Sequence, residues 1–447
     1  MSFWKNQPNN NQLNNINQLN NNFIILQSRQ NVINIQDEII NKLLIDAPFL
    51  SQITYECIDQ YNVQCNVESN NVESNVQCNV ESNNVESNNV EFNVQCNVEF
   101  NSQEQTTNLL TDELLNEITI FLKDNYIDFL VYDISLIRWF SNNALIHLFR
   151  NKSKLIGMSM LKKSNVVIND QQLISTEGNF LCLQKSLKHS NIGIGKLVMA
   201  KTIRETFSRI KNLQISHHTV AYRISTPHIL VRKSYHYAIN EDYLYNIKFL
   251  IDRPPKLGSK KRYTIVQTPR DKVQLQEFYY NYQKKNYNIF MNIELETVFN
   301  TNVFTNYILY NHDELIGYFC FAFYNMNLNN NPIRGLMLYL AAYKGNIYNI
   351  LPNVLSIVNH LYVDHSIDHS IDHSIDHSID HSTQHSTQYS TQYSTQYSTQ
   401  YSIDVVTFQD FLDIDYYKIG CISSDSSLYH ILYNYNVDNP KSSIVTL

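Results

Sequence analysis

The chain has 447 residues, of which 43% are hydrophobic and 12% aromatic, enough for a substantial core and for roughly two to three domains. Its net charge of −7 and its pI of about 6.1 argue against binding to nucleic acid or to an anionic membrane surface. Seven cysteines without a CxxC pair argue against a disulfide framework or a cysteine zinc site. The lack of a leader or of an apolar run of about 18 residues predicts a soluble, cytoplasmic protein without membrane insertion.

Three polar tracts interrupt the chain. Residues 9–36 are rich in Asn and Gln, residues 62–100 repeat NVQCNVESNNVES units, and residues 364–402 repeat every four residues, first as DHSI and then as STQY. Such tracts bury too little apolar surface to offset chain entropy, so we predict disordered or loop insertions. The histidines of the last tract would form one stripe on a helix and could chelate a metal. Repeat expansion in a tolerant surface loop is the favoured alternative, because Ser, Thr and Asp disfavour helix, and we predict no metal site.

Two similar α/β units are predicted outside these tracts. Residues 111–124 have the apolar spacing of an amphipathic helix and precede a candidate hairpin at 147–161. Residues 272–284 and 307–321 repeat this order. The two hairpins match at one offset of 160 residues, through Asn151 and Asn311, Leu155 and Leu315, Ile156 and Ile316, and Gly157 and Gly317. A coincidental pair of hairpins is the alternative to a duplicated unit.

The segment 178–204 reads as a strand, a loop with two glycines and the start of a helix. The chain has only 9 glycines, yet Gly193 and Gly195 stand together in SNIGIGK. Glycine lets backbone N–H groups approach a ligand closely, and a helix N-terminus adds unpaired donors that favour phosphate. The loop lacks the Lys-Ser/Thr of a P-loop and the third glycine of a dinucleotide fingerprint. A structural turn and a phosphate-binding loop both fit these residues.

These patterns predict a mixed α/β (α+β) fold with two tandem domains and long low-complexity insertions. A Pro- and Gly-containing segment at 251–261 marks the expected junction. The predicted parts are an N-terminal arm at 1–61, an insertion at 62–108, a first domain at 109–253 and a second domain at 254–447 that contains the insertion 364–402.

A hairpin, a strand and an SxxGxG loop that opens a helix resemble the acyl-CoA-binding core of GNAT acyltransferases. Two such units in one chain resemble the N-myristoyltransferase (glycylpeptide N-tetradecanoyltransferase) family, which is built from two GNAT-like halves. The resemblance implies transfer of a myristoyl group from myristoyl-CoA to the N-terminal glycine amine of cytosolic proteins. It also implies no permanently bound cofactor, peptide and protein partners that begin with glycine, and a monomer.

Local motifs carry this resemblance in the family's order. FWKNQP (3–8) is similar to the FWxTQP start, with Asn6 in place of Thr, and GNFLCLQKSLK (178–188) is similar to NFLCVHKKLR. The second match implies that the backbone N–H groups of Phe180 and Leu181 form an oxyanion hole. The basic RSKR that follows in the family is HSNIG here. The implied coenzyme-binding residues are Phe3, Trp4, Asn179, Cys182, Leu183, Lys188, Ser190, Asn191, Ile192, Gly193, Ile194, Gly195 and Lys196.

Other segments resemble the family's peptide-binding regions. They are ITIFLKDNYIDFLVYDISLIRWF (118–140), HTVAYRISTP (218–227), RKSYHYAIN (232–240), LYLAAYKGN (338–346) and KIGCISSDSSLYHILYNY (418–435). The implied peptide-binding residues are Tyr126, Tyr132, Thr219, His236, Tyr343 and Asp425. The acidic cluster of the first region is largely missing here, Asp425 lies in SSDSS instead of GDG, and Tyr435 replaces a Trp.

The chain end completes the implied mechanism. In the family the C-terminal carboxylate is the general base, which corresponds to Leu447 here. An N-terminal amine with a pKa near about 8 must lose a proton before it attacks a thioester, and a buried carboxylate can accept it. Direct addition and elimination needs no covalent enzyme intermediate. Cys182 beside the oxyanion hole could serve as a nucleophile, although a buried strand cysteine is more often inert packing.

Two alternatives remain open. A different GNAT-type N-acetyltransferase would need only the 178–204 core and would give no role to Trp4 or Leu447. An inactive scaffold would act through its Asn-rich and repeated segments.

Overall fold

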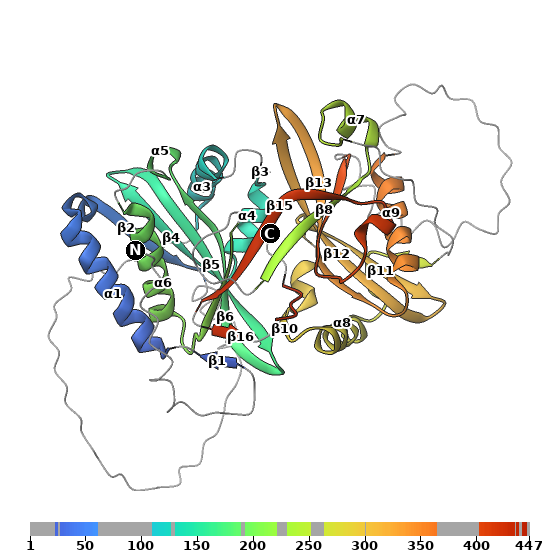
Figure 1. The fold of residues 1–447 in the computed structure, drawn as a ribbon, viewed down its shortest axis with the longest axis horizontal. Coiled ribbons are helices and arrows are strands. Elements are labelled where there is room, and N and C mark those ends of the chain that lie inside the picture. Colours follow the sequence, from blue (N-terminus) through green and yellow to red (C-terminus); the bar gives the residue numbers. More distant parts are fainter. Residues whose placement is uncertain are drawn as a thin grey trace, which may run out of the picture.

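The computed structural model describes residues 23–25, 27–60, 110–126, 130–188, 193–220, 230–251, 263–299, 301–363, 402–433, 435–437 and 440–444 (Figure 1). Within them one 14-stranded sheet runs through the molecule, with helices on its faces. The predicted mixed α/β fold class is therefore confirmed. No helix of the described segments is long and apolar enough to cross a membrane.

The first half of the sheet is a run of strands that ends in a parallel crossover. Its order is β2-β4-β5-β6-β7, and β7 lies parallel to β6 after helix α6. The bounds are β2 (Ile53–Asp59), β4 (Ala144–Asn151), β5 (Lys154–Ile168), β6 (Gln171–Leu183), α6 (Ile194–Arg209) and β7 (Ile215–Val220).

The second half repeats this arrangement. Its strands run β9-β11-β12-β13-β14, and β14 lies parallel to β13 after helix α9. The bounds are β9 (Thr264–Val266), β11 (Phe304–Asn311), β12 (Glu314–Leu328), β13 (Asn331–Tyr343), α9 (Ile347–Val363) and β14 (Val405–Gln409). The strands β4, β5 and β6 start 160 residues before β11, β12 and β13 and have the same lengths of 8, 15 and 13 residues. This repetition supports the duplicated unit over a coincidental pair of hairpins.

The halves exchange strands where they meet. Strand β8 (Leu230–Ala238) follows β7 in the chain but pairs with β14, and β15 (Ile422–Tyr433) follows β14 but pairs with β7. β15 also pairs with β8, so the order at the centre is β7-β15-β8-β14, which we call the seam. Figure 1 shows β15 beside β8. The domain boundary between 253 and 254 remains a prediction, because the sheet continues through strands from both sides of it.

Helices cover the sheet, and smaller elements complete the fold. Helix α1 (Arg29–Asp46) packs along α6, and α8 (Lys272–Asn286) packs on β12 and β13. The remaining elements are β1 (Phe23–Ile25), a 3₁₀ turn (Pro48–Gln52), α3 (Asp112–Asn125), β3 (Leu130–Val131), α4 (Ile134–Ser141), α5 (Lys185–Lys188), α7 (Glu241–Asn246), β10 (Ile289–Met291), 3₁₀ turns (Leu295–Val298 and Tyr416–Ile419) and β16 (Tyr435–Val437). The helices predicted at 111–124 and 272–284 correspond to α3 and α8.

The prediction that residues 9–36 form a disordered or loop insertion is partly wrong. Residues 29–36 were expected within an Asn-rich disordered tract, but they form the first turns of α1. The Ser28 side chain accepts a hydrogen bond from the Asn31 N–H and caps the helix. Val32 is fully buried in a cluster with Ile203 and Phe207 of α6, so a few apolar residues in a polar stretch suffice to dock it. The predicted insertion at 62–108, and all but the last residue of the one at 364–402, lie outside the described residues.

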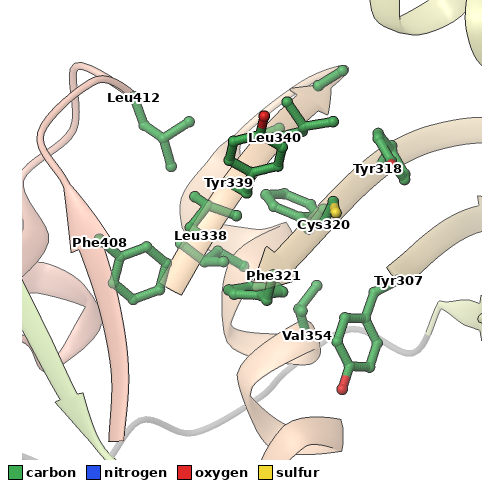
Figure 2. Close-up of a cluster of buried hydrophobic side chains, with 14 of the residues drawn as sticks. Tyr307, Tyr318, Cys320, Phe321, Leu338, Tyr339, Leu340, Val354, Phe408 and Leu412 are labelled. Atoms are coloured by element: carbon green, nitrogen blue, oxygen red, sulfur yellow. The ribbon is translucent and has the colours of Figure 1, made fainter. Parts of the chain in front are cut away.

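The largest core fills the second half (Figure 2). Aromatic side chains dominate it, and the rings of Tyr307, Tyr318, Phe321 and Phe408 are fully buried. The Tyr318 hydroxyl donates to Asn306 Oδ1 at 2.9 Å, and Asn306 Nδ2 donates to the Val298 carbonyl at 3.1 Å. The buried Tyr318 hydroxyl and Asn306 amide are thus held by hydrogen bonds, which offsets the cost of their desolvation.

Replacing Tyr318 with Phe should lower the free energy of unfolding by about 1–3 kcal/mol, because the buried Asn306 Oδ1 atom loses its donor. Urea denaturation measures this change. The matched control is Tyr417→Phe, where the ring is 59% exposed and the expected change is within about 0.5 kcal/mol. Equal losses in the two variants would contradict the structural role of this hydrogen bond.

Candidate active site

A β-bulge interrupts the pairing of β5 with β6. The register runs Met158 with Cys182 and then Met160 with Asn179, so Phe180 and Leu181 together face Ser159. Phe180 has φ +55°, which is uncommon for a residue other than glycine and costs on the order of 1–3 kcal/mol. Bulges of this kind redirect backbone and side chains next to active sites. The corresponding bulge between β12 and β13 contains no residue with positive φ in the described chain.

Aromatic packing holds the bulge in place. The Phe180 ring is fully buried and meets Tyr132 at 5.0 Å and Phe140 at 5.3 Å, both edge to face. The Tyr126 ring lies 5.4 Å from that of Tyr132, tilted by 60°, and 6.4 Å from that of Phe180. The structure therefore brings the predicted residues Tyr126, Tyr132 and Phe180 together. Leu181, in contrast, points outward and is 42% exposed.

The Phe180 N–H already has a hydrogen-bond partner. It donates to Oδ1 of the neighbouring Asn179 at 3.2 Å. An oxyanion at this position would have to replace the amide oxygen of Asn179. The Asn179 side chain would therefore compete with an oxyanion for the Phe180 N–H.

Cys182 is packed as an inert thiol. Its side chain is buried, and burial raises the pKa of the thiol to about 12, with Lys188 and Lys185 opposing the shift. A protonated thiol is a weak nucleophile. The site therefore supports inert packing of Cys182.

The loop before α6 ends in a left-handed glycine. Gly193 has φ +79° and is the N-cap of α6, whose first residues are Ile194, Gly195 and Lys196. Ile194 is buried, Lys196 is exposed and the Lys188 ammonium donates to the Tyr126 carbonyl at 2.8 Å. A helix N-terminus with basic residues nearby can hold an anion. The predicted residues Ser190, Asn191 and Ile192 lie outside the described residues.

The second glycine of the loop is closely packed. A Cβ on Gly195 would lie 3.3 Å from Leu183 Cδ1, and one on Gly157 would lie 3.0 Å from Leu183 Cδ2. Leu183 ends β6 and fits between these two glycines. Close approach of strand and helix therefore explains Gly195 without any ligand.

A buried charged pair lies close to the bulge in sequence and was missed by the sequence analysis. Lys162 of β5 pairs with Glu177 of β6, three residues before Phe180. Burial lowers the pKa of Lys162 and raises the pKa of Glu177, and each group partly opposes the other's shift. The Lys162 ammonium lies 3.4 Å from the ring centroid of Trp139 on α4. A Glu within the predicted strand, two residues before NFLCL, is the signal that could have revealed this pair.

The other predicted peptide-binding residues lie on separate elements. Thr219 is half-buried on β7 and pairs with His430 of β15. His236 Nδ1 is 2.9 Å from Thr407 Oγ1, and burial lowers its pKa to about 4. Tyr343 ends β13 and its ring lies 5.0 Å from that of Tyr282. The backbone of Asp425 lies in β15.

The segment before the chain end is held at the seam. The Arg232 side chain donates to the Ser442 carbonyl, and Ser442 forms a bridge with Ile289 of β10. Ile444 is buried in a cluster that includes Ile215 of β7 and Leu432 of β15. Residues 442–444 therefore run between the two halves toward β7 and β15. Leu447 itself, like Phe3 and Trp4, lies outside the described residues.

No cluster of three or more His, Cys, Asp or Glu side chains is placed to hold a metal ion in the part of the chain that the structure describes.

No protein-family model matches the chain, and no curated protein matches it significantly in sequence. Solved structures do match. A crystal structure of Saccharomyces cerevisiae N-myristoyltransferase with bound myristoyl-CoA has a TM-score of 0.55 and 16% identity, covering 75% of this chain and 82% of that one. A second has a TM-score of 0.52 and 16% identity, covering 75% and 87%. A third, with myristoyl-CoA and inhibitors, has a TM-score of 0.52 and 17% identity, covering 75% and 85%.

At 16–17% sequence identity, these matches show that the fold is similar. The predicted resemblance to N-myristoyltransferase is confirmed at that level, since the match spans most of both chains. The roles of individual site residues remain predictions.

Replacing Gly193 with Ala should lower the free energy of unfolding by about 1–2 kcal/mol, because an L residue is strained at φ +79°. Its Cβ would also lie 3.2 Å from Leu43 Cδ2 of α1. Gly195→Ala is the control, since its φ is not positive and Ala gains up to about 1 kcal/mol over Gly within a helix. If thermal unfolding shows equal losses for both, the left-handed cap is not the cause.

Replacing Glu177 with Gln should remove part of the pH dependence of stability. Burial raises the pKa of native Glu177 above its ordinary value of 4.5, so the native state keeps a proton that the unfolded chain releases. The stability contributed by that proton is complete below pH 4.5 and is lost as the pH rises through the raised pKa. The free energy of unfolding of Glu177→Gln should therefore improve relative to wild type over that range.

Chemical denaturation at a series of pH values tests this expectation. Glu38→Gln is the control, because Glu38 is exposed on α1 and should leave the profile unchanged. A constant difference between Glu177→Gln and wild type across the range would show that Glu177 does not titrate as described.

Proposed function

We propose that the chain is an acyltransferase that moves a myristoyl group from myristoyl-CoA to the N-terminal glycine amine of cytosolic proteins. The observation that carries the proposal is the bulge at Phe180 and Leu181, followed in the same half by the capped N-terminus of α6. The counterpart half lacks the strained residue. The shared fold with proteins crystallised with myristoyl-CoA supports the same conclusion.

The proposed coenzyme site follows the strand-loop-helix order. The pyrophosphate of the coenzyme would bind at the N-terminus of α6, near Gly193, Gly195 and Lys196, with Lys188 adding positive charge. The acyl chain would lie toward Phe3 and Trp4, as the resemblance implies. The thioester carbonyl would face the bulge, where the N–H groups of Phe180 and Leu181 would receive the developing negative charge. Removing one such donor typically costs about 3–4 kcal/mol of transition-state stabilisation.

The proposed chemistry needs a base near the bulge. The ammonium of the peptide loses a proton to the C-terminal carboxylate of Leu447, and the amine nitrogen then attacks the thioester carbon. The carbon–sulfur bond breaks as the amide forms, and the sulfur takes up the second proton lost from nitrogen. Two contacts at the seam support this role. The hydrogen bond from Arg232 to the Ser442 carbonyl and the burial of Ile444 hold the segment before the chain end near β7 and β15.

The peptide would bind along the seam and the aromatic cluster. Tyr126 and Tyr132 would flank its first residue, Thr219 would lie near its amine, and His236, Tyr343 and Asp425 would contact later residues. We further propose a cytoplasmic monomer, since both halves of the proposed site belong to one chain.

Incubation of the purified protein with labelled myristoyl-CoA and a peptide that begins with glycine tests the function. We expect transfer to the amine of this peptide and none to its N-acetylated form. Absence of transfer from myristoyl-CoA would refute the proposal, and efficient transfer from acetyl-CoA instead would establish the N-acetyltransferase alternative.

A variant extended by several residues after Leu447 tests the base. Its transfer rate should fall by about 10²–10⁴-fold, the usual contribution of a general base, because the carboxylate moves away from the amine. The control carries the same added residues within the predicted insertion 364–402, which has no role in the proposed site, and should keep the wild-type rate. Undiminished transfer by the extended variant would exclude the carboxylate as base.

A further inference from the structure

Four buried polar atoms on neighbouring strands, three of them in the seam, have no hydrogen-bond partner among the residues that the structure describes. They are Glu177 Oε1 on β6, His217 Nδ1 on β7, His430 Nε2 on β15 and Arg232 Nε on β8. These side chains are at most 3% exposed. Unpartnered buried polar atoms are rare and costly, and their alignment on consecutive strands calls for an explanation. We call these four residues the seam row.

The register places the seam row on one face of the sheet. Glu177 pairs with His217. His217 and Thr219 are two residues apart and therefore lie on the same face of β7. Thr219 pairs with His430, and Arg232 pairs with Leu428, which shares a face with His430. The row therefore starts on the strand that carries the bulge and ends at the arginine that holds the Ser442 carbonyl.

His217 and His430 form a hydrogen-bonded pair inside the row. His217 Nε2 lies 3.2 Å from His430 Nδ1, and the rings stack with centroids 5.4 Å apart and 21° between their planes. A neutral imidazole has one N–H and one acceptor nitrogen. Whichever ring donates to the other, one outer nitrogen of the pair is a donor and the other is an acceptor.

The surroundings keep both rings neutral. Burial lowers the pKa of His217 to about 3 and that of His430 well below its usual range, and the positive charge of Arg232 adds to both shifts. The other titratable groups near the pair are His218 on β7 and the Glu177 and Lys162 pair on β6 and β5. At neutral pH each ring is therefore neutral and keeps one donor and one acceptor nitrogen.

We propose that the His217–His430 pair is a proton relay of the acyl-transfer reaction. The relay rests on the proposed function, in which an ammonium and a thioester become an amide, a thiol and one proton. That excess proton passes from the Leu447 carboxylate, which is thereby regenerated, to the acceptor nitrogen at one end of the pair, the shared proton crosses the 3.2 Å hydrogen bond, and the N–H at the far end releases its proton. Reorientation of the rings restores the starting tautomers.

Variants that keep the hydrogen bond but cannot relay a proton test this role. Gln at 217 places an amide where Nε2 lies, and Asn at 430 places one where Nδ1 lies. His217→Gln and His430→Asn should slow single-turnover acyl transfer by about 100-fold, within the usual range for proton-transfer groups, while the affinity for myristoyl-CoA is unchanged. Imidazole added to His430→Ala should restore part of the rate.

The matched control is His147→Gln. His147 is also fully buried with its pKa lowered to about 3, but its Nδ1 lies 2.8 Å from the Tyr55 hydroxyl and its Nε2 lies 3.2 Å from Thr206 Oγ1. Both its nitrogens are thus partnered, and this variant should keep the wild-type single-turnover rate and gain nothing from imidazole. Circular dichroism verifies folding of each variant.

The outcomes separate the two proposals. If the wild-type protein transfers no acyl group, the proposed function itself fails. If wild type is active and His217→Gln and His430→Asn match its rate, the relay is refuted. Equal slowing in His147→Gln, or no rescue of His430→Ala by imidazole, would likewise refute the relay in favour of a packing role.

Discussion

The exchange of strands at the seam is the constraint on which the rest of the molecule depends. β15 fills the gap between β7 and β8, and without it the two halves of the sheet would end in open edges. The same exchange places residues from both halves on one face, among them Thr219, His217 and His430. The proposed site therefore depends on long-range strand pairing more than on either half alone.

Duplication followed by divergence explains why the two halves look alike but differ in chemistry. β6 and β13 have equal lengths and both meet their neighbours through a bulge, yet only the first has a left-handed residue there. At the strand ends, Leu183 fits between two glycines, whereas its counterpart Tyr343 contacts Tyr282. The first half has the strained backbone at its bulge, and the second half has aromatic packing at the end of the corresponding strand.

Local patterns could be read from the sequence, and pairings distant along the chain could not. Thr111 and the apolar residues after it define α3 by capping and spacing, and Gly193 identifies the start of α6. The 160-residue offset predicts the duplicated hairpins because turn residues and apolar runs recur together. In contrast, nothing in HHTV or in LYHIL indicates that His217 and His430 meet, since 213 residues separate them. The buried Glu177 was missed because a charged residue on a strand normally faces solvent.

The position of β15 also governs the order in which this chain can fold during synthesis. β7 ends at Val220 and its partner β15 begins at Ile422, so about 200 residues must leave the ribosome before that edge is paired. Until then the first half presents an open strand to other chains. The first half can therefore have all of its own strands and still keep an edge that is open to pairing, until the last part of the chain covers it.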